Sequence, residues 1–185
     1  MQTEKKQNLL IQSLLVLGTL GRLIPHPWNA TPMGAVSLVG GAKLKGMWRW
    51  ITPFLCLVAS DIVLQTFLYP TLNRDWLLGL PFIYAAFAVN IWMGRFASGE
   101  NRFAKVGGLS FVAATQFFIL TNFGTWLTTP FYAKTVEGLV QCYILAIPFF
   151  GPMILGNLAW SLGIYWAIEK SEQWAGAWKA ETASA

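Results

Sequence analysis

The chain alternates long apolar runs with short polar connections from one end to the other. A helix that crosses a bilayer core of about 30 Å needs roughly 20 apolar residues at a rise of about 1.5 Å per residue. The pattern predicts six spans, the first two of them short, at residues 8–20, 33–42, 50–69, 76–94, 106–127 and 149–168. We therefore expect an all-α polytopic membrane protein, a six-transmembrane-helix bundle that forms a single domain over residues 1–168.

One apolar stretch, residues 135–168, is too long for a single span. It contains a Pro-Phe-Phe-Gly-Pro motif at residues 148–152, and a proline inside a helix removes a backbone hydrogen bond and clashes with the preceding turn. We therefore predict a broken helix before the last span, with a short, partly re-entrant element over residues 135–147. The tail, residues 169–185, keeps two tryptophans one helical turn apart among charged residues, which is typical of a helix along the cytoplasmic membrane interface.

Composition and charge agree with a membrane protein. The 185 residues are 55% hydrophobic and 11% charged, against roughly 25% charged residues in a soluble domain. The net charge of +5 does not indicate nucleic-acid binding, because the basic residues lie in the connections between apolar runs.

The positive-inside rule predicts the orientation of the bundle. With six spans, ten basic residues fall on one side and three on the other. The first side holds Lys5, Lys6, Lys43, Lys45, Arg49, Arg95, Arg102, Lys105, Lys170 and Lys179, and the second holds Arg22, Arg74 and Lys134. We therefore expect a multi-pass protein of the bacterial inner (cytoplasmic) membrane with both termini in the cytoplasm.

A polar, proline-rich segment interrupts the apolar pattern between the first two predicted spans, at residues 22–32. Prolines prevent a regular helix here, and irregular backbone at membrane depth survives only against protein or water. Polar side chains at that depth usually line a cavity, pair with each other or serve a site. The segment therefore forms an irregular outer loop, and we predict that Arg22, His26, Asn29 and Thr31 contact a ligand.

His26 has three possible roles. As the histidine of this loop it could simply be hydrogen-bonded, it could contact a small-molecule ligand, or it could be an axial ligand of a chlorin or haem. Apart from that last alternative, no cofactor is predicted. A single histidine and two distant cysteines give no zinc or iron–sulfur pattern, so we predict no metal site.

Two further polar sets accompany the loop. Asp61 lies in the middle of the third predicted span, where a carboxylate must be protonated, paired or facing water, and Arg22 is the obvious partner. Such a pair either ties the loop to that span or also shapes the floor of a cavity. The second set is predicted to line the same pocket, although its aromatic members could equally form an interfacial belt. It contains Asn122, Trp126, Tyr132, Thr135, Gln141, Tyr143 and, deeper in the chain's last span, Asn157.

A resemblance to a known family rests on motifs spread over most of residues 20–165. They are the run over residues 22–35, Gly40-Gly41-Ala42, Ser60-Asp61, Asn122-Phe-Gly-Thr-Trp126, Gly138-Leu-Val-Gln-Cys142-Tyr143 and Pro148-Phe149. These motifs resemble an uncharacterised family of small bacterial integral-membrane proteins. That family is in turn similar to the substrate-binding S components of energy-coupling factor (ECF) transporters.

The resemblance implies six helices, cytoplasmic termini and a pocket near the outer face. It implies capture of a vitamin-like small molecule or a metal chelate, with ECF transmembrane and ATPase subunits driving release. S components that share an energising module usually carry an Ala-x-x-x-Ala motif on the first helix, and residues 8–20 have none. A solitary carrier that works without an energising module is therefore an alternative.

No catalytic motif is present in the sequence, so we predict a protein that is not an enzyme. Two functions are weighed. The first is small-molecule binding and uptake in the membrane. The alternative is an accessory structural subunit of a larger membrane complex, possibly associated with a pigment or haem through His26.

Overall fold

The structure is a computed structural model that describes residues 2–25, 29–68 and 74–184, with the side chains of 2–4, 68, 76 and 177–184 left out of the description. All secondary structure in these ranges is helical. The elements are α1 (Gln2–Leu20), the 3-10 turn η1 (Gly21–Leu23), α2 (Met33–Lys43), α3 (Trp48–Val63), the π-helical turn η2 (Leu64–Leu68), α4 (Arg74–Gly94), α5 (Arg102–Thr128) and α6 (Val136–Ser184). This confirms the predicted all-helical class.

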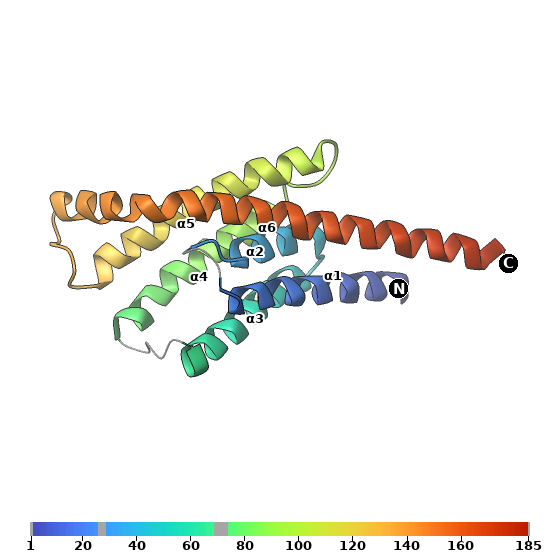
Figure 1. The fold of residues 1–185 in the computed structure, drawn as a ribbon, viewed down its shortest axis with the longest axis horizontal. Helices are drawn as coiled ribbons and strands as arrows, with labels where there is room; N and C mark the ends of the chain where they lie inside the picture. The colour runs from blue at the N-terminus through green and yellow to red at the C-terminus, as the bar shows by residue number, and fades with distance from the viewer. Residues whose placement is uncertain (1, 26–28, 69–73, 185) are drawn as a thin grey trace.

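The short helix α2 lies at the centre of the bundle. It contacts each of the other five α-helices, and eight of its 11 residues are buried. A helix that is apolar on all sides is stable only when other elements surround it. Figure 1 shows α2 enclosed by the longer helices and both chain termini at the same end of the bundle.

Close helix packing fixes the position of α2 against α4. A Cβ atom at Gly41 would overlap the main-chain oxygen of Ile91, and one at Gly94 would overlap that of Leu38. Glycine is therefore required at both positions for the two backbones to approach this closely. The contact lies near the C-terminal end of α2. It therefore also fixes the depth in the bundle of the N-terminal end of this short helix, at Met33.

Four helical stretches in the described part of the chain are long and apolar enough to cross a membrane. They are Trp48–Phe67, Leu77–Gly94, Arg102–Thr128 and Val136–Gly176. The helices expected near residues 8–20 and 33–42 are present, but α2 is only about 16 Å long at about 1.5 Å per residue and reaches roughly half of a bilayer core. By length and composition these helices indicate a membrane protein, with four candidate spans in the described residues rather than the six that the sequence predicted.

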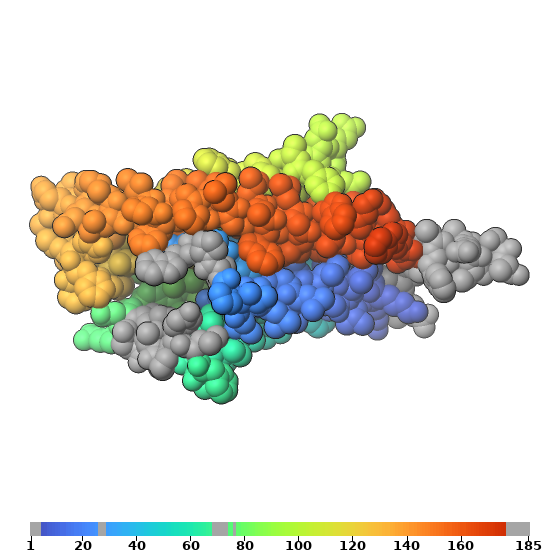
Figure 2. Space-filling model, viewed as in Figure 1, coloured from blue at the N-terminus to red at the C-terminus, as the bar shows by residue number. Residues whose placement is uncertain are grey.

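The predicted break at residues 148–152 is wrong. Helix α6 continues for 49 residues through Pro148 and Pro152, and the predicted re-entrant element over residues 135–147 is its first part. The two prolines are four residues apart, so the lost hydrogen bonds lie on one face of the helix. An open break would instead expose several backbone groups at membrane depth. Figure 2 shows α6, from orange to red, crossing the whole face of the molecule.

Ion pairs tie the helices together at the end that carries the termini. The Nζ of Lys43 binds Glu169 and lies 2.9 Å from the Oε2 of Glu172. The NH1 of Arg102 lies 3.2 Å from the Oε2 of Glu169, and the Gln7 amide donates to Glu172 over 2.8 Å. Burial alone would lower the pKa of Lys43, but the hydrogen bonds to the two carboxylates outweigh it and hold that pKa above its ordinary value. The cluster joins α1, α2, α5 and α6.

Candidate functional site

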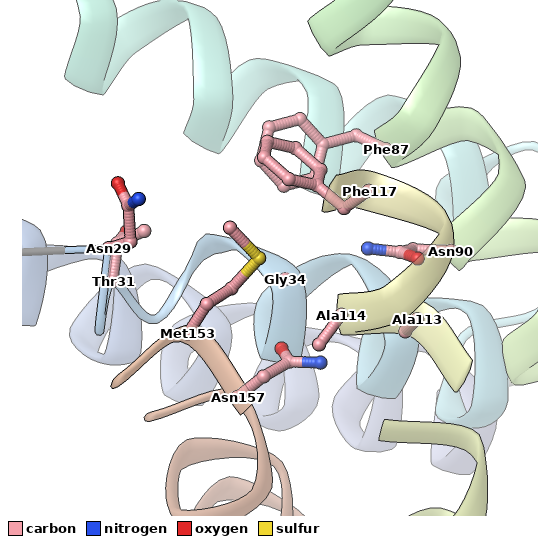
Figure 3. A pocket seen from close by; sticks show the side chains of 10 residues that line it. All are labelled: Asn29, Thr31, Gly34, Phe87, Asn90, Ala113, Ala114, Phe117, Met153 and Asn157. Carbon is pink, nitrogen blue, oxygen red and sulfur yellow. The ribbon is translucent and has the colours of Figure 1, made fainter. Parts of the chain in front are cut away.

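A cavity lies at the N-terminal end of α2, where the polar loop enters the bundle. Its volume is about 50 Å³, and about 370 Å³ is free of protein atoms when the adjoining open space is included. Residues from the loop and from α2, α4, α5 and α6 surround it (Figure 3). The lining consists of Asn29, Thr31, Gly34, Phe87, Asn90, Ala113, Ala114, Phe117, Met153 and Asn157.

Asn157 of α6 lines this cavity and keeps a hydrogen-bond acceptor without a partner. Its amide nitrogen donates to the main-chain oxygen of Ser110 over 2.7 Å. Because a carbonyl only accepts, this bond fixes which end of the amide faces α5 and leaves Oδ1 on the other side. The side chain is 4% exposed, and Oδ1 has no hydrogen-bond partner. It lies against Gly34 in the first turn of α2, where a Cβ atom would overlap it.

Asn90 of α4 presents a donor to the same space. The amide nitrogen of Gln116 donates to the main-chain oxygen of Ala86 over 2.9 Å and to the Oδ1 of Asn90 over 2.7 Å. The Ala86 carbonyl fixes the Gln116 amide, which in turn fixes the Asn90 amide with its oxygen toward α5. The Asn90 nitrogen therefore faces the cavity, as Figure 3 shows.

The rest of the lining is apolar. The rings of Phe87 and Phe117 lie with their centroids 4.9 Å apart on one side of the cavity, opposite Asn157 (Figure 3). Met153 from α6 reaches into the middle of the view, between these rings and Asn157. No charged side chain is among the described residues that line the cavity. The described lining can hydrogen-bond and stack, and it contains no acidic or basic side chain.

The loop that closes the cavity is held by α6. Asn29 has a φ of 63°, a left-handed conformation that asparagine tolerates better than most residues. Next to it, the main-chain oxygen of Ala30 accepts a 3.0 Å hydrogen bond from the Nε1 of Trp160, and the Cα of Gly156 packs closely on Ala30. The hydroxyl of Thr31 accepts from the backbone N–H of Met33, at the start of α2, over 3.3 Å. Asn29 and Thr31 thus lie at the cavity, as their position in the sequence suggested.

Arg22 and Asp61 form a separate polar cluster. Their NH1 and Oδ1 atoms lie 2.7 Å apart, so the pairing inferred from the sequence exists in the structure. Arg22 also donates to the hydroxyl of Ser60 over 2.7 Å, and the hydroxyl of Tyr84 donates to the second carboxylate oxygen over 3.2 Å. The cluster joins η1, α3 and α4 outside the cavity lining. Its geometry ties the loop to α3.

The late polar set lies in the α5–α6 hairpin. The Nε1 of Trp126 donates to the main-chain oxygen of Ala133 over 2.9 Å, and the hydroxyl of Tyr143 donates to that of Ile119 over 2.7 Å. Asn122 bonds one turn back in its own helix. Thr135 accepts from the Gly138 N–H at the start of α6, and Gln141 is exposed. Tyr132 lies in the same connection.

Apart from Asn157, this set is not part of the cavity lining. On α6 the nearest lining residue, Met153, is about 15 Å along the helix from Tyr143 at about 1.5 Å per residue. The structure therefore separates the sequence-predicted residues into three places: the cavity, the Arg22 cluster and the hairpin. His26, with its alternative roles, lies outside the described residues.

A family model described as a family of unknown function, DUF6580, matches residues 2–177 of this sequence. The chain belongs to the DUF6580 family. No curated protein and no solved structure matches it. The match includes every element that lines the cavity, from the loop to α6.

The prediction of site residues from this DUF6580 sequence missed Asn90 and Gln116, and it named Asn157 only as the deeper member of the late polar set. Each is an uncharged amide within an apolar stretch, and all three are tied to another helix by the bonds described above. An amide in a predicted span is the available signal, because it is costly unless it is bonded or serves a site.

Proposed function

We propose that this chain is a membrane-embedded protein that binds a small molecule in the cavity at the start of α2 and takes part in its uptake. The observation that carries the proposal is the Oδ1 atom of Asn157, a residue of the cavity lining, which is buried and without a hydrogen-bond partner. A buried acceptor without a partner costs about 1–3 kcal/mol. A ligand that donates a hydrogen bond to this atom would remove that cost.

The chemistry of the lining supports binding without catalysis. The cavity is formed by amides, a hydroxyl, aromatic rings and a thioether. Such groups orient a ligand, whereas general acid–base chemistry needs a titratable group within hydrogen-bond reach. We therefore propose a binding protein that is not an enzyme.

We propose uptake in the manner of the ECF S components that the sequence resembles. Two features support this. The cavity opens at the end of α2 opposite the ion-pair cluster and the termini, so cytoplasmic termini would place it on the outer side. The helices that surround it, α4, α5 and α6, are all candidate spans. Since α1 carries no Ala-x-x-x-Ala motif, the partners would be an ECF module recruited through other contacts, or none.

The test is native mass spectrometry of the protein purified from its own membrane in mild detergent. We expect the chain to carry a reproducible small-molecule mass, and we expect Asn157→Leu to lose it. Asn122→Leu is the matched control, because this amide lies outside the lining and bonds only within α5. Met153→Trp, which fills the cavity, is a second variant should Asn157→Leu fail to fold.

The same spectrum distinguishes the alternatives. Co-purifying ATPase subunits would support the ECF mode, and a monomer with its ligand would support a solitary carrier. Stoichiometric membrane partners without any small molecule would overturn the proposal in favour of an accessory subunit.

A further inference from the structure

We propose that the groove between α1 and α3 binds one acyl chain of an anionic phospholipid. The headgroup of this lipid lies at the end of the bundle that carries the chain termini. The site is separate from the cavity at the start of α2 and does not depend on it. Three features of the groove carry the inference: its volume and walls, its length, and the charge at its mouth.

Helices α1 and α3 run in the same direction along the groove. The amide nitrogen of Gln12 donates to the hydroxyl of Thr52 over 3.2 Å. Further along both helices, Arg22 donates to the hydroxyl of Ser60 over 2.7 Å. Because the second contact follows the first in both segments, the two helices are parallel, and both begin at the end of the bundle that carries the termini.

The groove is large enough for a hydrocarbon chain. Its volume is about 430 Å³, and its lining runs from Gln12 to Leu23 on one side and from Trp48 to Val63 on the other. An apolar cavity of about 150 Å³ holds a benzene ring, so this space takes roughly 18 carbon atoms, the size of one phospholipid acyl chain. A partner helix, about 10–12 Å across, would lie over such a groove rather than fill it.

The walls of the groove suit hydrocarbon. No charged side chain is among the described residues that line it. The hydroxyls of Thr19 and Ser60 donate to main-chain oxygens of their own helices over 2.8 Å and 2.9 Å, and the hydroxyl of Thr52 accepts from Gln12. Since these hydroxyls are hydrogen-bonded within the protein, they do not require a polar ligand. The aliphatic lining, such as the exposed side chain of Leu55, is left for contact with an acyl chain.

The length of the groove matches one leaflet of a bilayer. From Trp48 to Val63, helix α3 rises about 22 Å at about 1.5 Å per residue. Half of a bilayer, with its headgroup layer, is about 20–22 Å thick. Trp48 is exposed at the start of α3, and tryptophan favours the headgroup layer. A chain that enters beside Trp48 therefore ends near the bilayer centre, next to the Arg22–Asp61 pair.

Basic residues lie at the mouth of the groove, which is its end at Trp48. Lys5 precedes Gln12 by about two helical turns and therefore lies on the groove face of α1. Lys45 lies in the connection just before α3, and both lysines are exposed. Arg49 follows Trp48 in the first turn of α3. Basic residues at a membrane surface attract anionic headgroups.

The acidic residues Glu169 and Glu172 do not neutralise this mouth. Both bind Lys43, and Glu172 also accepts a hydrogen bond from Gln7 over 2.8 Å. Gln7 lies about 200° around α1 from Lys5, so the acidic cluster is on the opposite side of that helix. The mouth of the groove therefore favours an anionic phospholipid over a zwitterionic one.

The experiment is native mass spectrometry of the delipidated full chain in mild detergent, mixed with equal amounts of dioleoyl phosphatidylglycerol and dioleoyl phosphatidylcholine. These lipids have the same chains and differ in headgroup charge. We expect one phosphatidylglycerol per chain, bound about tenfold or more tightly than phosphatidylcholine. Lys5→Gln and Lys45→Gln should each weaken that binding about fivefold, the effect of one basic residue at a lipid surface. Lys105→Gln, at an exposed position of α5, should leave it unchanged.

A second pair of variants tests the groove itself. Ala59→Trp places an indole ring in the lining, at an exposed position where the larger side chain does not disturb the core. Ile62→Trp is the matched control, because Ile62 is exposed on α3 outside the lining. We expect Ala59→Trp to lose the lipid and Ile62→Trp to keep it. Asn157→Leu should also keep it, so failure of this site is distinguishable from failure of the proposed function.

Equal retention of the two lipids, or binding that neither lysine variant weakens, would overturn the anionic ligand. Equal retention in Ala59→Trp and Ile62→Trp would overturn the groove as its site. A membrane protein that co-purifies in stoichiometric amount, with no lipid bound, and is lost in Ala59→Trp would show that a partner covers the groove instead.

Discussion

The side-chain nitrogen of Asn157 lies 2.7 Å from the main-chain oxygen of Ser110, and this bond joins α6 to α5 at the depth of the cavity. The same bond turns the Asn157 oxygen toward the first turn of α2. One buried amide therefore has two roles. It connects two long helices, and it keeps an acceptor without a partner in the lining of the cavity.

Asn157→Asp should destabilise the protein more than its small change in shape suggests. An ionised aspartate cannot donate to the Ser110 carbonyl. Two acceptors would therefore face each other in a buried site unless the aspartate is protonated. We expect a loss of about 1–3 kcal/mol in unfolding free energy, the cost of unsatisfied buried polar groups. Thermal unfolding in detergent measures it. Asn122→Asp, at a half-buried position, is the control, and equal losses in both variants would contradict this account.

Gly41→Ala should disrupt the crossing of α2 and α4. The added methyl group would overlap the backbone of Ile91, which cannot move aside as a side chain could. We expect a loss of at least about 2 kcal/mol, or no folded protein. Gly108→Ala is the matched control in α5, because no atom outside its own helix lies within 4 Å of its Cβ position. It should stabilise by about 0.5–1 kcal/mol through helix propensity. Fluorescence-detected size-exclusion chromatography after heating compares the two.

Arg22 and Asp61 should show strong coupling in a double-mutant cycle. Removing either partner leaves a charge in a poorly hydrated site, at a cost of about 3–5 kcal/mol for a fully buried pair. The side chains here are 21% and 13% exposed, so we expect about 2–4 kcal/mol for Arg22→Met or Asp61→Leu. The double variant should lose far less than the sum. Additive losses would mean that the two side chains do not stabilise each other.

The course of the chain could largely be predicted from the sequence. The expected helix at 33–42 is Met33–Lys43, and the one at 76–94 is Arg74–Gly94. Both are apolar runs bounded by proline or charge, so the local pattern decides them. The prediction for residues 135–168 was wrong. The hydrophobic pattern alone does not compare the two hydrogen bonds lost at the prolines with the larger number of backbone polar groups that an open helix break would expose.

The site could be predicted only where the backbone itself is unusual. Prolines and polar residues mark the loop, and Asn29 and Thr31 do lie at the cavity. Asn90 and Asn157 gave a weaker signal. A single amide in an apolar helix has the same sequence pattern whether it faces lipid, a neighbouring helix or a ligand. Which of these holds depends on helix pairing and rotation, and those are set by tertiary contacts such as Gly41 against Ile91.

The Lys43 cluster should make stability depend on pH in the alkaline range. The carboxylates of Glu169 and Glu172 raise the folded-state pKa of Lys43 above 10.5 despite its burial. Its contribution is therefore complete below about pH 10.5 and is lost as the pH rises through the folded-state value. We expect the melting temperature of the wild type to fall more steeply above that pH than that of Lys43→Met. Parallel curves from about pH 8 to about pH 11.5 would argue against a role for this ammonium group.

The orientation of the bundle decides whether the cavity can serve uptake. The ten-to-three distribution of basic residues predicts cytoplasmic termini, with the α2–α3 connection inside and the α5–α6 connection outside. In a background with Cys56 and Cys142 replaced by alanine, we expect Lys134→Cys to react with an impermeant maleimide on intact cells. Lys45→Cys should react only after permeabilisation, and both positions are exposed on the protein. The reverse labelling pattern would mean that the cavity opens to the cytoplasm. The protein could then not capture a ligand from outside.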